Sequence, residues 1–326
     1  MNNPISDQSR RIVVLGTGGT IAGSSAKAGA NVGYTAGTVP VTALLDGFSA
    51  PDGFELHVEQ VAQIDSKDMD FATWRSLHER CQYWLAQDDV AALIITHGTD
   101  TIEETSFFLH STLNATKPVV MTCAMRPATS TNPDGPQNLR DAITVASSPD
   151  ATGVMIVCAS EIHGAKEISK THPYRLNAFN SGDAGPIGYV EEGRVRLVRQ
   201  WPQEAHVSTA ISLPPADNWP RVDIVLSHAG TRGEIVNALI REHQENHTDA
   251  AAGIILGATG NGSLHQSLEQ AGLAARDAGI EVLVATRCIA GHIIPSLSEK
   301  LPISIDLSPV KARIALLLKL ISKDQK

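Results

Sequence analysis

The stretch AALIITHGTDTIEETSFF, residues 91–108, decides the fold of this chain. Its first six residues are apolar and rich in β-branched side chains, which is typical of a strand buried on both faces of a parallel sheet. The run ends at His97, and a helical pattern begins soon after, where Thr101 and Glu104 have the spacing of a capping box. We therefore predict a buried strand, a short turn and a helix that starts just beyond Asp100.

The turn after this strand carries groups that can do chemistry. Thr99 supplies a hydroxyl and Asp100 a carboxylate, both at the carboxyl end of the predicted strand and beside a helix amino terminus. In open α/β sheets, ligands bind at this edge. We therefore expect a functional site here.

A second stretch has the same design. Residues 12–15 form a short apolar run, and GTGGTIAG follows at residues 16–23. The glycines allow a sharp turn and a close approach to a ligand, while Thr17 and Thr20 supply hydroxyls. A nucleotide-binding turn is the alternative, but the third glycine of a G-x-G-x-x-G pattern would fall on Ile21. We therefore favour a site that uses a threonine hydroxyl.

Strand-like runs recur along the chain and alternate with helical patterns. They lie at residues 12–15, 91–96, 119–123, 154–159, 222–227, 254–258 and 282–286. This alternation predicts an α/β fold with parallel sheets rather than a run of hairpins. The periodicity lapses at residues 201–221, which contain four prolines. We expect a larger N-terminal parallel-sheet domain at residues 1–200, a linker at 201–221 and a smaller C-terminal α/β domain at 222–326.

Two helices are predicted near the C-terminus. One covers residues 264–278, with Ser263 as its N-cap and Gly279 just beyond its end. The last helix begins at Ser308 and Pro309, which have the positions of an N-cap and first helical residue.

Composition excludes several classes of partner. The formal net charge of -9 argues against a nucleic acid or an anionic membrane. The chain has no run of 18 apolar residues, and its first residues, MNNPISDQSRR, lack the apolar segment of a signal peptide. The four cysteines are widely spaced and form no CxxC pair, so we expect reduced thiols in a cytoplasmic protein.

The motifs TGGTIAG and HGTDTIEET lie about 80 residues apart and resemble the two signature motifs of the bacterial-type L-asparaginase and glutaminase-asparaginase family. The resemblance extends to SIDLSPVKAR near the C-terminus. It implies a cofactor-free amidohydrolase that converts L-asparagine to L-aspartate and ammonia. It also implies a homotetramer or homodimer. Secreted members of the family carry a disulfide at a position that is Ala115 here, which favours the cytoplasm.

The resemblance assigns catalytic roles to five residues. Thr20 would be the nucleophile, and Tyr34 from a mobile lid would take its proton. Lys170 would hydrogen-bond Thr99, with Asp100 beside them. A lysine beside a carboxylate stays protonated unless burial outweighs the ion pair, so Lys170 acts either as a base or as a support for Thr99.

Five residues of the first domain would bind the substrate, and Thr99 is one of them. Asp100 would hold its α-amino group and Ser66 its α-carboxylate. Lys67 stands where many members carry Gln or Glu, and it either pairs with that carboxylate or points to solvent. The backbone of Ala124 would lie near the side-chain amide.

Asn261, and more loosely Glu299, match positions that the family contributes from a neighbouring subunit. The alternative for both is an ordinary loop position. No metal is expected, because His243 and His247 have helical spacing but Gln244 replaces the acid of an H-E-x-x-H motif.

Two alternatives to an asparaginase stay open. The first is a dual glutaminase-asparaginase. Glutamine has one methylene more than asparagine, and one methylene in a pocket changes the discrimination between two substrates by only about 1–3 kcal/mol. A non-catalytic amino-acid sensor belongs to a different class and would be expected to lack one of the catalytic groups. Thr20, Thr99, Asp100 and Lys170 are all present.

Overall fold

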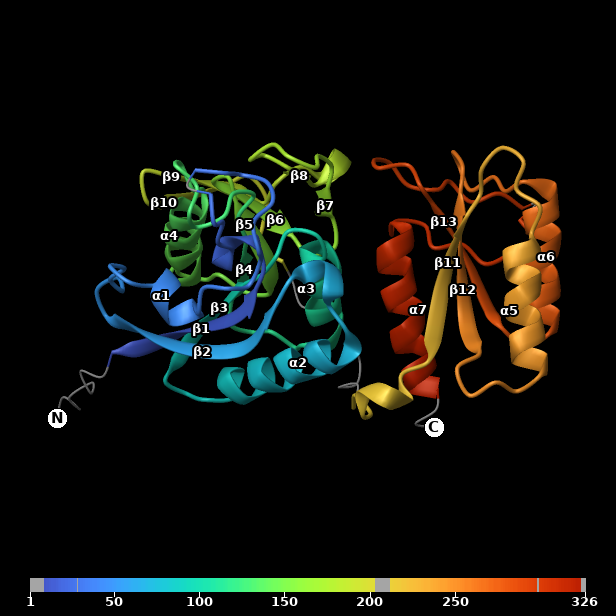
Figure 1. Ribbon diagram of the computed structural model, residues 1–326, viewed down its shortest axis with the longest axis horizontal. Helices are drawn as coiled ribbons and strands as arrows, with labels where there is room; N and C mark the ends of the chain where they lie inside the picture. Colours follow the sequence, from blue (N-terminus) through green and yellow to red (C-terminus); the bar gives the residue numbers. More distant parts are fainter. Residues whose placement is uncertain (1–8, 28, 203–211, 298, 324–326) are drawn as a thin grey trace. The chain divides into compact units, whose positions relative to one another are not determined.

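Apolar strands and amphipathic helices alternate through the computed structural model, which describes residues 9–27, 29–202, 212–297 and 299–323. The chain divides into two compact units, Met1–Ala210 and Ile211–Lys326 (Figure 1). The first is built on a sheet of eight strands and the second on a sheet of three. The predicted α/β class, with a larger N-terminal and a smaller C-terminal part, is confirmed. The predicted linker lies partly outside the described residues and stays a prediction.

The large sheet has the strand order β10-β9-β6-β5-β4-β3-β1-β2. Its strands are β1 (Arg10–Gly18), β2 (Phe54–Ile64), β3 (Val90–Thr96), β4 (Val119–Thr122), β5 (Val154–Cys158), β6 (Glu161–Gly164), β9 (Gly188–Glu191) and β10 (Arg194–Leu197). Strands β2, β1, β3, β4 and β5 pair in parallel, as predicted. From β5 to β10 the pairing is antiparallel, and the predicted parallel alternation did not include β6, β9 and β10.

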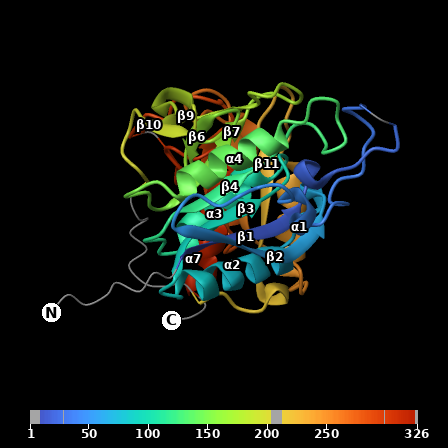
Figure 2. The same cartoon turned by 90° about the vertical axis from the view of Figure 1, so that its left-hand side faces the viewer.

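Helices cover both faces of this sheet (Figures 1 and 2). On one face, α4 (Gly135–Ala146) and the short α1 (Val41–Leu44) pack on alternate strand residues in one buried apolar cluster. On the other lie α2 (Phe71–Leu85) and α3 (Ile102–Thr112). These two helices are joined by Trp74 and Phe108, whose rings stack with centroids 4.8 Å apart. The parallel strands are therefore buried on both faces, as their continuous apolar runs predict.

A small ribbon stands apart from the large sheet. It consists of β7 (Ser169–Lys170) and β8 (Phe179–Asn180), which pair in an antiparallel manner. Neither strand was predicted, because two residues are too few to show a period.

The second unit is a parallel sheet of β11 (Arg221–Leu226), β12 (Ala251–Ala258) and β13 (Glu281–Thr286). Helices α5 (Glu234–Gln244) and α6 (Gln266–Asp277) pack together on one face. Helix α7 (Pro309–Lys323) covers the other face (Figure 1).

The helix termini of the second unit differ from prediction at one point. The N-cap of α6 is His265, whose side chain accepts a hydrogen bond from Ser267 N–H, and not Ser263. Ser263 exchanges backbone hydrogen bonds with Thr259 instead. Helix α7 starts at Pro309, as predicted.

Candidate active site

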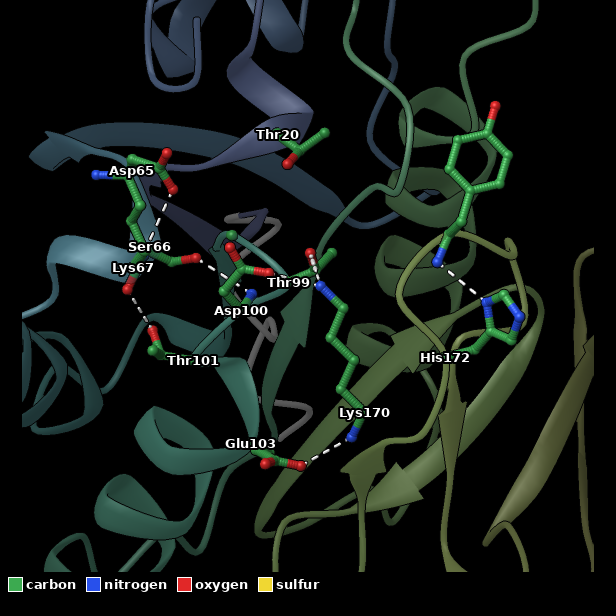
Figure 3. A network of polar contacts seen from close by, with 12 residues as sticks. Thr20, Asp65, Ser66, Lys67, Thr99, Asp100, Thr101, Glu103, Lys170 and His172 are labelled. Carbon is green, nitrogen blue, oxygen red and sulfur yellow. Dashed lines mark hydrogen bonds and ion pairs between the residues drawn. The ribbon is translucent and has the colours of Figure 1, made fainter. Parts of the chain in front are cut away.

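The candidate site lies at the carboxyl ends of β4, β3, β1 and β2, which are neighbours in the large sheet. Thr20 follows β1, Ser66 follows β2, and Ala124 follows β4, while Thr99 and Asp100 follow β3. Parallel strands end at the same edge of a sheet, so segments far apart in the sequence meet there. Figure 3 shows Thr20, Ser66, Thr99 and Asp100 gathered in this region.

Two glycines allow the loops after β1 and β3 to touch. Gly19 has a φ of +79°, and a Cβ atom there would lie 2.2 Å from Gly98 Cα. A Cβ atom on Gly98 would lie 2.3 Å from Ser66 Oγ. No side chain fits at either position. The two glycines therefore bring the loop of Thr20 against the loop of Thr99.

The two hydroxyls of the glycine-rich loop have different partners. Thr17 Oγ1 donates to the Thr96 carbonyl at 2.9 Å and so ties β1 to β3. Thr20 Oγ1 lies 2.7 Å from the Tyr34 phenol oxygen, and either atom can be the donor. Thr20 is only 7% exposed. It is therefore the hydroxyl with a neighbour that can exchange a proton.

Tyr34 lies at the end of a segment that folds back over the glycine-rich loop. Ser24 and Thr35 exchange backbone hydrogen bonds of 3.0 and 2.8 Å. The Tyr34 ring lies so close to Gly23 that a Cβ atom there would be 2.9 Å from Tyr34 Cδ2. These contacts hold the phenol against Thr20.

Lys170 bridges Thr99 and Asp100 (Figure 3). Its Nζ donates to Thr99 Oγ1 at 2.8 Å and to Asp100 Oδ1 at 2.6 Å. The side chain of Lys170 is 18% exposed and that of Asp100 is 53% exposed. The ammonium is thus held largely inside the protein, and the carboxylate keeps a surface that a cationic ligand group can reach.

Ser66 links the loop after β2 to the start of α3. Its buried Oγ accepts the Asp100 backbone N–H at 3.2 Å, and its carbonyl accepts the Thr101 hydroxyl at 2.8 Å. Thr101 therefore does not cap its own helix through its side chain, so the Thr101 half of the predicted capping box is wrong. The predicted start of the helix is correct, because α3 begins at Ile102.

Lys67 is exposed and paired within its own loop. Its Nζ forms an ion pair with the neighbouring Asp68. The hydrogen bond to Asp68 raises the pKa of Lys67. Of the two alternatives for this side chain, the structure favours the one in which it faces solvent.

His97 is completely buried at the end of β3. Its Nδ1 lies 2.8 Å from the Gly98 carbonyl, which requires a proton on Nδ1. Its Nε2 has no hydrogen-bond partner among the described residues. Burial lowers the pKa of His97 to about 4. The ring is therefore neutral near pH 7 and supports the backbone of the loop.

Two carboxylates that sequence reasoning missed hold the backbone of the site. Glu103 Oε2 accepts the Lys170 N–H at 2.8 Å. Asp134 accepts the N–H groups of Met125 and Arg126 at 2.8 and 2.9 Å, which fixes the loop after β4. Both residues stand at helix starts, where an acidic residue is ordinary. No local signal separates their role from that ordinary one.

Asn261 and Glu299 belong to the second unit. Asn261 Nδ2 donates to the Ile294 carbonyl at 2.9 Å, and its Oδ1 accepts the Ile294 N–H at 2.7 Å. Glu299 Oε1 accepts the Ser296 N–H at 2.6 Å. Both line a cavity of about 390 Å³. Their roles as site residues stay predictions.

Among the described residues, no group of three or more His, Cys, Asp or Glu side chains is arranged to hold a metal ion. His243 Nδ1 lies 3.2 Å from the Ala251 carbonyl, and His247 lies 3.1 Å from Glu245. In the same described part of the chain, no helix is long and apolar enough to span a membrane.

Comparison with known proteins gives a consistent result. Residues 11–203 match the family model described as "Asparaginase, N-terminal", and residues 221–326 match "Glutaminase/Asparaginase C-terminal domain". "L-asparaginase 2" of Bacillus subtilis is 33% identical over 95% of this chain and 82% of its own length. "Glutaminase-asparaginase" of Pseudomonas fluorescens is 31% identical, covering 93% and 84%.

A solved structure is similar over almost the whole chain. It is described as "Probable Cytoplasmic L-asparaginase from Campylobacter jejuni" and is 34% identical, with a TM-score of 0.87 over 97% of this chain and 98% of that one. The family resemblance stated from the two motifs is thus confirmed.

Proposed function

Because this chain belongs to the asparaginase family, we propose that it hydrolyses L-asparagine to L-aspartate and ammonia. The observation that carries the proposal is the pairing of Thr20 with Tyr34 in the same site as the Thr99–Lys170–Asp100 group. One pair offers a nucleophile with a proton acceptor. The Thr99–Lys170–Asp100 group offers a carboxylate for an amino-acid ligand and a lysine that holds Thr99 in place.

The chemistry has two halves. Thr20 Oγ attacks the carboxamide carbon of asparagine and transfers its proton to Tyr34. The carbon–nitrogen bond then breaks as the Tyr34 phenol gives up a proton to the departing nitrogen, which leaves as ammonia, with an ester left on Thr20. Water attacks this ester in the second half, one of its protons passes to the Thr20 oxygen, and aspartate is released. Lys170 supports this through Thr99, whose hydroxyl it holds in place.

Substrate recognition uses the charges of an amino acid. The exposed face of Asp100 pairs with the α-ammonium group, and Ser66 donates to the α-carboxylate. Lys67 is the weaker candidate for that carboxylate because Asp68 already neutralises it. The backbone at Ala124 lies next to the side-chain amide of the substrate. This arrangement favours a small α-amino acid over a peptide.

The proposal includes a cytoplasmic location and a homo-oligomer. Four free cysteines, three of them buried, fit a reducing compartment. The similar Campylobacter jejuni protein is described as cytoplasmic. A homotetramer or homodimer is proposed from the predicted role of Asn261.

The test is ammonia release from asparagine and from glutamine, measured side by side on the purified protein. We expect higher kcat/KM with asparagine. Equal values would favour a dual glutaminase-asparaginase, the second candidate, which the name of the Pseudomonas relative suggests. Binding of asparagine without ammonia release would contradict the proposal and favour an amino-acid sensor.

A further inference from the structure

Lys170 lies on a support that is weak by itself. It belongs to β7, a strand of two residues that pairs with β8 in a separate two-stranded sheet. An isolated ribbon of this size is at best marginally stable in water. Yet Lys170 Nζ lies 2.8 Å from Thr99 Oγ1 and 2.6 Å from Asp100 Oδ1, which both follow a strand of the large sheet. The backbone of the ribbon therefore needs an anchor on the main body of the unit.

Glu103 provides such an anchor. Its Oε2 accepts the Lys170 backbone N–H at 2.8 Å. Glu103 lies in the first turn of α3, a helix that packs against the large sheet. A hydrogen bond from N–H to a carboxylate is stronger than one between neutral groups. A negative charge is also favoured at a helix amino terminus.

Residues 99–103 thus bind both the side-chain ammonium and the backbone N–H of Lys170 (Figure 3). Thr99 and Asp100 bind its Nζ, and Glu103, three residues further on, binds its backbone N–H. We propose that Glu103 is a positioning residue for catalysis, which fixes the backbone of Lys170 so that the ammonium stays on Thr99 and Asp100. This inference rests on the proposed function, in which Lys170 and Thr99 contribute to the rate.

Loss of the anchor has a specific kinetic consequence. In Glu103→Ala the ribbon can shift while the contacts of Thr20 remain. A misplacement of about 1 Å in a catalytic group can lower the rate about 100-fold. Because Lys170 is not proposed to bind the substrate, KM should change little. Glu103→Gln keeps an acceptor oxygen at the same place and should restore most of the activity.

The experiment compares Glu103→Ala, Glu103→Gln, Lys170→Met and the double variant Glu103→Ala/Lys170→Met in the intact protein. We expect Glu103→Ala to lower kcat roughly 10- to 100-fold with KM within about threefold. In the Lys170→Met background, Glu103→Ala should add no further loss, since its effect passes through the lysine. Glu234→Ala is the matched control, because Glu234 also lies in the first turn of an 11-residue helix.

A second readout is independent of activity. Backbone hydrogen exchange at Lys170 should accelerate in Glu103→Ala and stay as in the wild type in Glu234→Ala. Unchanged exchange, or a kcat equal to that of the wild type, would overturn the proposal for Glu103. The proposal would also be overturned if Glu103→Ala lowered kcat by the same factor in the Lys170→Met background as in the wild type. Full activity of Lys170→Met, or no ammonia release by the wild type, would instead count against the proposed function.

Discussion

At the scale of single residues, the two threonines of the glycine-rich loop have different roles. Thr20 is the proposed nucleophile, and Thr17 ties β1 to β3. Thr20→Ala should lower kcat by on the order of 10³-fold or more, because the covalent step loses its nucleophile. The pocket keeps Ser66 and Asp100, so aspartate should still bind. Ammonia release and calorimetric titration with aspartate measure the two effects.

Thr17→Val is the control for this prediction. It removes the hydrogen bond to Thr96, which costs about 1 kcal/mol of stability, and leaves the Thr20 hydroxyl in place. It should therefore keep most of the wild-type kcat. If Thr20→Ala retained as much activity as Thr17→Val, Thr20 would not be the nucleophile.

His97 makes stability depend on pH. Its pKa is about 4 in the folded protein and about 6.5 when unfolded. Between these values the unfolded chain binds more protons, so the free energy of unfolding rises with pH through this window. The difference is worth roughly 3 kcal/mol, fully present above pH 6.5 and lost as pH falls toward 4.

Denaturant unfolding at pH 4.5 and pH 7 checks this contribution. In His97→Gln the gain in stability between the two values should shrink. Some gain should remain, because burial also lowers the pKa of His78. An unchanged gain would mean that His97 takes up its proton in the folded protein as easily as in the unfolded chain.

Residue roles could be predicted from the sequence only where a motif carries them. The motifs and their contexts singled out Thr20, Tyr34, Thr99 and Lys170, and the structure pairs the first two and joins the last two. A role that depends on a partner far away in the sequence does not appear in a local motif. The partner of Glu103 lies 67 residues away in the sequence.

At the scale of elements, burial decided which strands could be recognised. Six of the seven predicted runs coincide with fully or largely buried strands, and the seventh coincides with β11, which is only half-buried. β2 was missed although it has 11 residues, because it lies at the sheet edge and is only half-buried, so its apolar residues form no continuous run. The hairpin of β9 and β10 was missed for a related reason. Its strands have four residues each, and its turn is Glu192-Gly193 rather than the usual Asn-Gly or Asp-Gly.

The contact between the β1 and β3 loops gives a prediction at this scale. Gly19→Ala should nearly abolish activity, because its Cβ would collide with the Gly98 backbone and push the loop of Thr20 away. Gly47→Ala is the control. Gly47 has the same φ of +79°, but nothing lies within 4 Å of a Cβ atom there.

Both variants carry the backbone strain of a positive φ, and Gly19→Ala carries more of it, because the ψ of −170° at Gly19 belongs to a region that is essentially confined to glycine. Only Gly19→Ala adds the collision between loops. Thermal unfolding and kcat together separate the backbone strain from the collision between loops. Gly47→Ala should have a lower Tm than the wild type but keep its kcat. Equal kcat values in the two variants would show that close contact between the loops is not required.

At the scale of the whole molecule, the proposed homo-oligomer predicts that the loop held by Asn261 lies at an interface between chains. Asn261 fixes the backbone at Ile294 through both of its amide atoms. On the same loop, Ile289 is 73% exposed and Ile294 is 68% exposed. Large apolar side chains that gather on a surface commonly mark an interface. A second copy of this chain is the partner that the proposed homo-oligomer calls for.

The last prediction is that the site requires this partner. If Asn261 completes the site of a neighbouring chain, Thr20→Ala and Asn261→Ala homo-oligomers should both be nearly inactive. Co-expression should recover activity, because some sites in mixed assemblies then receive both wild-type groups and others receive neither. The measurement is ammonia release per site for the mixture and for each parent. Activity no greater than the sum of the parents, or full activity of a dilute monomer, would show that each chain carries a complete site.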